Sequence, residues 1–403
     1  MLTTLSVYVI SLSLDALLRS VLGMIGITPL LYIRDILMIL AVVFCVIKKS
    51  TYKTILILLV IEFYSLVGVY YTDNLTEVFW GVKTILPFIY GVYAYEFIKN
   101  NERFVTKLFL ITVLLSCLGI GLNYFIEDPF WQHIEGTEVL GATTEGVRNW
   151  WIYIAGEKFR RLSGFTRLAG TTAIILLLSS SWLFAYHKRK YLLLIFTFPF
   201  ILLTTIKVSI GVYIVCIIMM LAYKFLSKEK CLFLFKFIIA FFAFLGLFLP
   251  IISLVLGTYT SVLDTEMLRL IFASTEDRML NSWPGSLGLV FNYGNMLLGR
   301  GIGGLGYGVS LFDEKVHDIT PIDNFFVFLY GNIGILLIIF ISYILYRIYK
   351  LKELTEENMF ILFATTVFMG EAIMGDMADQ FSMMFLGFIV RSLILKAFEV
   401  KST

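Results

Sequence analysis

The sequence is poor in charged residues. Asp, Glu, Lys and Arg together make up 15% of its 403 residues, against about 25% in soluble domains. Hydrophobic residues reach 59% and aromatic residues 16%. A water-soluble fold of this length needs more charge than this to cover its surface. The composition therefore excludes a soluble globular domain and leaves a polytopic membrane protein.

Cysteine is also scarce, and the cysteines that occur are not paired in sequence. Cys45, Cys117, Cys216 and Cys231 lie within or at the ends of apolar stretches, without a Cys-x-x-Cys spacing. We therefore expect neither a disulfide framework nor a zinc site. The net charge of +3 is too small to favour nucleic-acid binding. The sequence predicts no metal, no cofactor and no nucleic-acid partner.

The apolar runs predict a chain that is helical throughout. A helix needs about 20 mostly apolar residues to cross a bilayer. The chain begins MLTTLSVYVI, without a basic region or a cleavage site, so we expect an uncleaved first span. Twelve spans are predicted, at 2–22, 30–47, 54–71, 76–98, 104–126, 164–186, 190–206, 208–226, 232–257, 322–346, 358–375 and 380–398.

Lys and Arg collect in alternate connections, as the positive-inside rule requires. Residues 188–190 form one such basic connection, whereas the short connections 23–29, 72–75 and 376–379 contain no Lys or Arg. The sequence therefore predicts one all-α transmembrane domain over residues 1–403, with about twelve transmembrane helices and both termini in the cytoplasm.

Two outer connections, 127–163 and 258–321, are too long to be simple turns. Loops of this length in a compact protein are usually functional. The tryptophans of the first loop, Trp131, Trp150 and Trp151, also fit an aromatic belt at the headgroup level. In the second loop, apolar residues between 263 and 271 share a helical face and indicate an interfacial helix.

A glycine-rich run, GRGIGGLGYG, begins at Gly299 and contains the spacing G-x-G-x-x-G twice. A dinucleotide site needs a preceding strand, a following helix and a cytosolic setting, whereas this run is expected in an outer loop of an all-helical membrane protein. We expect instead a flexible segment that lets the backbone approach a bulky substrate, or a loop hinge.

Charges inside spans are costly and suggest function. Asp15 and Arg19 are four residues apart, which is the spacing of an ion pair within one helix. Arg19, Arg34, Lys83 and Glu371 fall in the outer halves of their predicted helices. We expect these groups to face a polar cavity that opens to the outer side.

Basic residues also gather at the long outer connections. Guanidinium groups bind phosphate oxygens in a bidentate manner, and a lysine adds a point charge. The pattern predicts an anionic ligand presented from the outer leaflet, and the alternative is a set of solvated charges attracted to lipid headgroups. The residues concerned are Arg148, Lys158, Arg160, Arg161, Arg167, Lys207, Arg269, Arg278, Arg300 and Lys315.

An ordered set of short segments resembles the superfamily of Wzy-type O-antigen polymerases and WaaL-type O-antigen ligases. The segments are RLSGFTRLAG, LTTIKVSIG, EDRMLNSW, LLGRGIGG and PIDNFFVFLYGNIGILL. The superfamily places an outer loop with Arg and Trp before a Gly-rich segment. An Asn-led helix with Gly-x-x-Gly follows, matched here by Gly331 and Gly334. The first half of the chain resembles the superfamily only in hydropathy.

The resemblance implies roles for individual residues. Arg278 matches the loop arginine that contacts the lipid diphosphate, and Lys207 stands where an Arg is typical. Asp323 stands where ligases have a His, which favours a polymerase, and His317 is a second candidate base. A helix-capping role for Asp323 is the alternative. Arg161 matches an arginine of the polymerases, and the remaining candidates for substrate binding are Arg160, Arg167, Arg300 and Asn324.

The implied activity is that of a membrane glycosyltransferase in the bacterial inner membrane. It joins undecaprenyl-diphosphate-linked oligosaccharide repeat units at the outer face, without a metal and with inversion of the anomeric centre. Implied partners are membrane lipid, a chain-length regulator and a flippase. A ligase that transfers glycan to lipid A core or protein is one alternative. A lipid-linked oligosaccharide flippase or other transporter is another, although we find no repeated halves of the kind transporters have.

Overall fold

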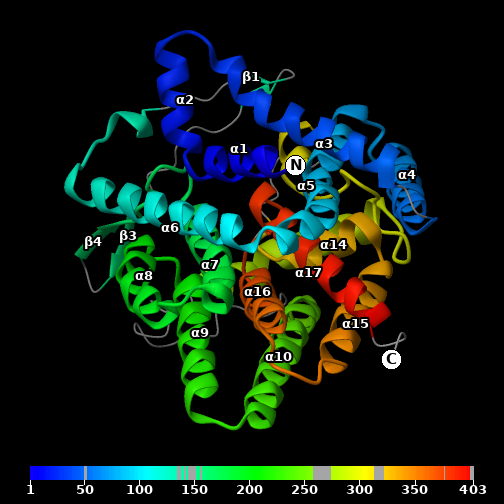
Figure 1. Ribbon diagram of the computed structural model, residues 1–403. Coiled ribbons are helices and arrows are strands. Elements are labelled where there is room, and N and C mark those ends of the chain that lie inside the picture. The colour runs from blue at the N-terminus through cyan, green and yellow to red at the C-terminus, as the bar shows by residue number, and fades with distance from the viewer. Residues whose placement is uncertain are drawn as a thin grey trace.

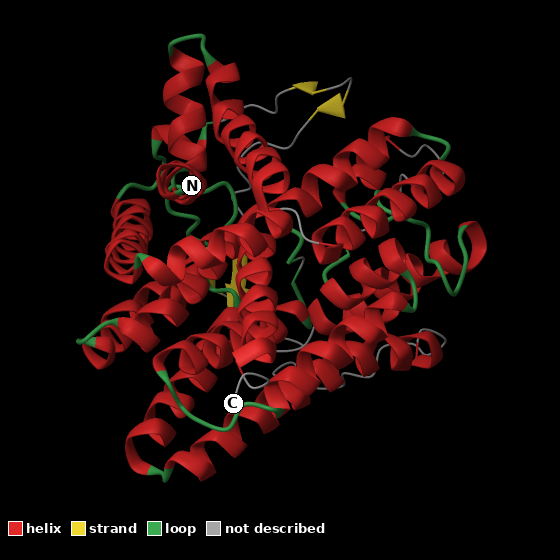
Figure 2. Cartoon of the chain, turned by 45° about the vertical axis from the view of Figure 1, so that its right-hand side comes forward, coloured by secondary structure: helices red, strands yellow, loops and turns green. Residues whose placement is uncertain are grey.

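The structure is a computed structural model, and it describes residues 1–49, 52–133, 138–139, 142–143, 151–154, 157–256, 274–312, 322–375 and 377–399. Most of the described residues are helical, and the strands form two short hairpins (Figures 1 and 2). The sequence prediction of an all-helical fold is therefore confirmed. The expected interfacial helix at 263–271 and the residues Arg148, Arg269, Lys315 and His317 lie outside the described residues.

The α-helices in the first half of the chain are α1 (Leu2–Ser13), α2 (Asp15–Met24), α3 (Ile33–Lys49), α4 (Tyr52–Thr72), α5 (Leu75–Asn100), α6 (Glu102–Phe125), α7 (Ala169–Tyr186) and α8 (Lys190–Thr204). Those in the second half are α9 (Lys207–Phe225), α10 (Lys228–Leu256), α12 (Trp283–Tyr293), α13 (Tyr307–Phe312), α14 (Phe325–Ile333), α15 (Leu336–Tyr349), α16 (Glu356–Ala372) and α17 (Gln380–Glu399). Single helical turns η1 (Thr28–Tyr32), η2 (Phe130–Gln132) and η3 (Arg278–Ser282) accompany them.

Six helices of the described chain are long and apolar enough to cross a membrane. A seventh is added if α1 and α2, which meet at a bend of 84°, count as one broken span. These helices indicate a membrane protein, whereas the count of twelve spans and their orientation stay predictions. The six spans are Thr28–Lys48, Ile55–Thr72, Glu102–Phe125, Ala169–Tyr186, Lys207–Phe225 and Lys228–Val255.

Two of the predicted spans are interrupted. The first breaks at Leu14 into α1 and α2, and the span predicted at 322–346 breaks into α14 and α15. Gly334 follows α14 with φ +56, a left-handed conformation that glycine adopts without steric cost. Irregular backbone at membrane depth persists only where protein or a polar cavity surrounds it. Both breaks therefore mark places where the helices meet other protein segments.

Small residues let central helices pack closely. A Cβ added to Gly91 of α5 would lie 2.1 Å from the Met384 carbonyl oxygen of α17, and one on Gly387 would lie 2.3 Å from the Phe88 oxygen. Helices in lipid gain stability mainly from such close packing, because apolar burial gives no driving force there. Helices α7 and α16 are buried along almost their whole length and form the centre of the fold.

Apolar side chains also face outwards in rows. Along α10, Phe233, Phe237, Phe241, Phe244 and Phe248 are exposed. Exposed rows of this kind are rare on soluble monomers and fit contact with lipid chains. The outer face of α10 thus agrees with a membrane setting.

The first long connection contains two antiparallel hairpins, β1 (Glu138–Val139) with β2 (Ala142–Thr143), and β3 (Trp151–Ile154) with β4 (Glu157–Arg160). The sequence did not predict these strands. Trp131 in η2 is buried, and its Nε1 donates a hydrogen bond of 2.9 Å to the Gly164 oxygen. Trp131 therefore packs inside the protein and is not part of a lipid-facing aromatic belt.

Candidate functional site

The glycine-rich run forms a loop that packs against helices. Gly301 has φ +81, and a Cβ there would lie 2.0 Å from the Gly68 nitrogen of α4. Gly303 has φ +90, and its Cβ would lie 2.5 Å from the Glu77 oxygen of α5. The Ile302 nitrogen donates to Tyr64 O at 2.8 Å. The expected close backbone approach is thus made to helices of the same chain, in a fixed loop.

Two polar side chains hold this loop in place, one from α14 and one from the loop itself. Asn332 accepts a hydrogen bond from the Gly303 nitrogen at 2.9 Å and donates to Leu305 O at 3.1 Å. Arg300 is 2% exposed, and its Nη1 donates to Gly304 O at 3.0 Å. Arg300, predicted to bind substrate, therefore lies inside the loop and stabilises it.

A group of charged side chains gathers from four segments that are far apart in sequence. We call Arg161, Lys207, Arg278 and Asp323 the Arg278 cluster. Arg278 forms an ion pair with Asp323, with its Nη2 2.9 Å from Oδ2. Lys207 interacts electrostatically with both Arg161 and Arg278. Arg161 and Arg278 thus interact with Asp323, and Lys207 interacts with these two cations, so three of the four members carry positive charge.

Arg278 is held at the start of the π-helical turn η3. Its Nε donates to Asp323 Oδ2 at 3.0 Å, and its Nη1 donates to the Ser274 Oγ at 2.8 Å. Single π turns occur often at functional sites, because the wider turn redirects a side chain. Trp283, which follows η3, is fully buried and anchors it. The guanidinium is therefore oriented before any ligand arrives.

Arg161 reaches the cluster from the chain that leads into α7. Burial lowers its pKa, the charge of Arg278 lowers it further, and Asp323 partly offsets both. Its Nε is buried and has no hydrogen-bond acceptor among the described residues. Lys207 is the first residue of α9, after Thr205 ends α8 in a left-handed conformation. Arg161 and Lys207 therefore reach Arg278 from two further segments of the chain.

Asn324 and Asp323 have different roles although they are neighbours. Asn324 is buried and caps α14, accepting a hydrogen bond from the Val327 nitrogen at 2.9 Å. Its Nδ2 donates to Ile373 O at 2.8 Å. The capping role that was the alternative for Asp323 thus belongs to Asn324. Asp323 faces Arg278, and its side chain is 36% exposed.

Arg167 lies in a second group of charges, the Asp15 cluster of Asp15, Arg19, Arg34 and Arg167. The expected pair of Asp15 with Arg19 is confirmed at 3.0 Å. Asp15 also contacts Arg34 at 2.7 Å and Arg167 at 2.9 Å, which the sequence did not predict. Arg160 belongs to neither cluster and donates to the oxygens of Asn123 and Ile126.

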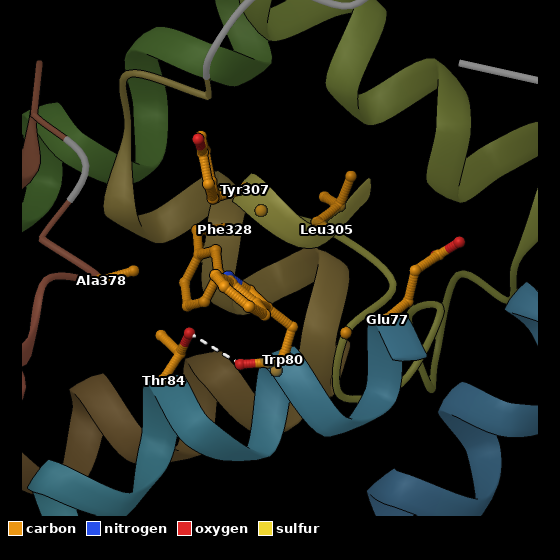
Figure 3. A pocket seen from close by; sticks show the side chains of 10 residues that line it. Glu77, Trp80, Thr84, Leu305, Tyr307, Phe328 and Ala378 are labelled. Atoms are coloured by element: carbon orange, nitrogen blue, oxygen red, sulfur yellow. Dashed lines mark hydrogen bonds between the residues drawn. The ribbon is translucent and has the colours of Figure 1, made fainter. Parts of the chain in front are cut away.

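A small cavity of about 50 Å³ lies between α5, the glycine-rich loop and α14 (Figure 3). Trp80 and Thr84 lie on its α5 side, with Tyr307 and Phe328 opposite. This volume suits water and is too small for a sugar ring. The remaining lining residues are Glu77, Gly81, Gly303, Leu305, Gly306 and Ala378.

The described part of the chain contains no group of three His, Cys, Asp or Glu side chains able to hold a metal ion. The four cysteines are buried and not disulfide-bonded. Comparisons with protein-family models, curated proteins and solved structures found no match to the chain. The two clusters of cations are therefore the main indication of function.

Proposed function

We propose that this chain is a polysaccharide polymerase of the bacterial inner membrane. It would join repeat units carried on undecaprenyl diphosphate by glycosyl transfer, on the outer side of the membrane. The observation that supports this is the Arg278 cluster. Three separate segments that resemble the polymerase and ligase superfamily contribute Arg161, Lys207 and Arg278, which interact electrostatically with one another, and Arg161 and Arg278 also interact with Asp323.

The reaction has two requirements that the cluster fits. An acceptor hydroxyl attacks the anomeric carbon of the donor glycan as the bond to undecaprenyl diphosphate breaks. The leaving diphosphate gains negative charge, which the cations Arg161, Lys207 and Arg278 would stabilise. The hydroxyl loses its proton, for which Asp323 is the acceptor within the described residues. Direct displacement inverts the anomeric centre.

Binding of the diphosphate would also change the state of Asp323. In the structure all three nitrogens of the Arg278 guanidinium contact Asp323 or Ser274. A diphosphate carries more charge than a carboxylate and would compete for the same donors. Arg278 then turns part of its guanidinium to the ligand and weakens its contact with Asp323. Donor binding would in this way free the carboxylate to accept a proton.

The glycan profile of the source strain tests this function. Deletion of the gene is expected to reduce the ladder of surface glycan to carrier bearing one repeat unit, and wild-type chain should restore the ladder. Arg278→Ala and Asp323→Ala chains, produced in normal amounts, should not restore it. Arg391→Ala is the matched control, because Arg391 forms an ion pair with Glu96 that is separate from both clusters.

Other outcomes separate the alternatives. Polymer that accumulates on the lipid carrier would identify a ligase. Wild-type ladders from both Arg278→Ala and Asp323→Ala would contradict the proposed site. An unchanged ladder in the deleted strain would exclude both enzyme functions and favour a transporter.

A further inference from the structure

The cavity between α5, the glycine-rich loop and α14 has walls that are fixed by hydrogen bonds (Figure 3). Asn332 of α14 holds the loop side, because it accepts a hydrogen bond from the Gly303 nitrogen at 2.9 Å and donates to Leu305 O at 3.1 Å. On the α5 side, Thr84 Oγ1 donates to Trp80 O at 3.1 Å. A site that is formed before binding loses little conformational entropy when a ligand arrives. The cavity is therefore preorganised to receive a small group.

The size of this cavity limits what can enter it. Its volume is about 50 Å³, and one water molecule needs about 10–15 Å³ on the same measure. The cavity therefore holds roughly four non-hydrogen atoms. A sugar ring is larger than this, whereas a single substituent of a ring fits. An acetamido group, which consists of a nitrogen, an oxygen and a pair of carbons, matches the volume.

The charges around the cavity favour a neutral substituent. Glu77 is the only charged residue among the described residues that line it. An anionic substituent would therefore find no cation in the lining. Lys83, which is not part of the lining, has its Nζ 4.6 Å from the centroid of the Trp80 ring. Because this cation already lies over the ring, a protonated amino group at Trp80 would meet like charge. Carboxylated sugars and free amino sugars are thus disfavoured.

The lining offers both apolar surface and a hydrogen-bond acceptor, as an acetamido group requires. Leu305, Phe328 and the Trp80 ring supply apolar surface for a methyl group. The Thr84 hydroxyl gives its proton to the backbone, so its lone pairs remain to accept a hydrogen bond from an amide N–H. Trp80 and Tyr307 are neighbours with ring centroids 6.3 Å apart, and Tyr307 is 41% exposed. The apolar face of the sugar ring would lie against these aromatic side chains.

The cavity lies next to the helix that follows the proposed base. Phe328 lines it from α14, and the Phe328 nitrogen donates to Asn324 O at 3.0 Å, one helical turn earlier. Asp323 directly precedes Asn324. One turn of helix rises about 5.4 Å, which is comparable to the width of one sugar ring. A sugar whose hydroxyl contacts Asp323 is therefore within reach of the cavity.

We propose that this cavity binds the acetamido group of the sugar that provides the acceptor hydroxyl. The inference rests on the proposed polymerase function and adds the substrate class, which is a repeat unit that ends in an N-acetylated amino sugar. A hexose without the acetamido group would leave water in the cavity and lose the contacts with Thr84 and the apolar lining, so the cavity selects between the two sugars. Binding there also orients the ring, so that one hydroxyl is presented to Asp323.

Ligand-observed NMR on the full-length protein in nanodiscs tests the inference without requiring catalysis. The probes are the methyl glycosides of N-acetylglucosamine and N-acetylgalactosamine, each compared with the parent hexoside. Saturation transfer from the protein should be strongest at the acetamido methyl of at least one probe. The parent hexosides should bind at least about 10-fold more weakly, because they lack both the methyl contact and the amide N–H.

Variants of the lining locate the binding. Ala378→Leu, which fills the cavity, should abolish saturation of the acetamido methyl. Thr84→Val should weaken binding by up to about 10-fold, because it removes the hydrogen-bond acceptor, and Thr84→Ser should retain binding. Thr72→Val is the matched control, since Thr72 also donates to a backbone oxygen one turn earlier, that of Gly68 at 2.9 Å, and does not line the cavity.

Two results would overturn the inference. One is an acetamido methyl that receives no saturation from the wild type, and the other is equal transfer in the wild type and in Ala378→Leu. If Ala378→Leu does not fold, a probe with a photoreactive N-acyl group is cross-linked to the wild type, and absence of label from α5 and α14 would overturn the inference equally. A glycan ladder that collapses on deletion of the gene, without acetamido binding, contradicts the cavity alone. Acetamido binding without chain extension contradicts only the polymerase reaction.

Discussion

Replacing Asp323 with asparagine separates its two roles, partner of Arg278 and proton acceptor. The carboxylate lies 2.9 Å from Arg278 Nη2, and its side chain is 36% exposed. Loss of such a partly exposed ion pair costs about 1 kcal/mol of unfolding free energy or less. Loss of a general base slows a reaction by about 10²- to 10⁴-fold, or about 2.7–5.4 kcal/mol in activation free energy. The second effect is the larger.

The assay follows extension of lipid-linked repeat units by purified chain in nanodiscs. Asp323→Asn should be made in normal amounts and extend glycan at least about 100-fold more slowly. Its KM for the donor should stay equal or fall, because Arg278 loses a competing anion. The control is Asp277→Asn, a carboxylate of the same turn that accepts a hydrogen bond from Asn281. A wild-type rate for Asp323→Asn would refute the reasoning, as would a rate loss that follows the loss of folded protein.

Three further predictions concern other parts of the chain. Lys207→Arg should keep activity, whereas Lys207→Ala should raise the donor KM about 10- to 100-fold in the same assay, because one charge-assisted contact is lost. Gly301→Ala should abolish folded protein, because its Cβ would lie 2.0 Å from the Gly68 nitrogen. The control is Gly288→Ala, whose Cβ would meet no atom within 4 Å and which should change the free energy of unfolding by about 1 kcal/mol or less. Burial raises the pKa of the Asp379 carboxyl, so the folded state keeps this group protonated to a higher pH than the unfolded chain does. The free energy of unfolding should therefore fall as pH rises through the raised pKa. Thermal melts of Asp379→Asn should lose this pH dependence.

The fold could be predicted from sequence where a helix is long and uniformly apolar. α6, α7, α9 and α10 follow from composition and length alone. The breaks at Leu14 and Gly334 could not be predicted, because each depends on segments far away in sequence. A Cβ on Gly334 would lie 2.1 Å from Leu297 O, so the loop before it sets the break. Hydropathy is averaged over consecutive residues, so it contains no information on contacts between distant segments.

The candidate site was predicted only in part, for a similar reason. Resemblance to a superfamily pointed to Arg161, Lys207 and Arg278, which the structure brings together. It also pointed to Arg300 and Asn324, which are buried and bonded to backbone. A basic or amide side chain near an outer loop looks the same in sequence whether it contacts ligand or its own backbone.

The sequence paired Asp15 with Arg19 because helical spacing makes that contact local. Its contacts with Arg34 and Arg167 span 19 and 152 residues, and no local rule predicts them. The sequence therefore predicted Arg19 as a partner of Asp15 but did not predict the other two arginines. The network of charges around Asp15 becomes visible only when all of these segments are placed in space.

The segment 161–167 links the two clusters, and its position is fixed by hydrogen bonds along its length. Phe165 O accepts from the Ala16 nitrogen of α2 at 2.8 Å. Gly164 O accepts from Trp131 Nε1 at 2.9 Å, and Ser163 Oγ accepts from Gln132 Nε2 at 3.2 Å. Because these partners belong to two other elements, α2 and η2, the segment cannot stretch without breaking its contacts to both. The separation of the Arg278 cluster from the Asp15 cluster is therefore a property of the packed fold.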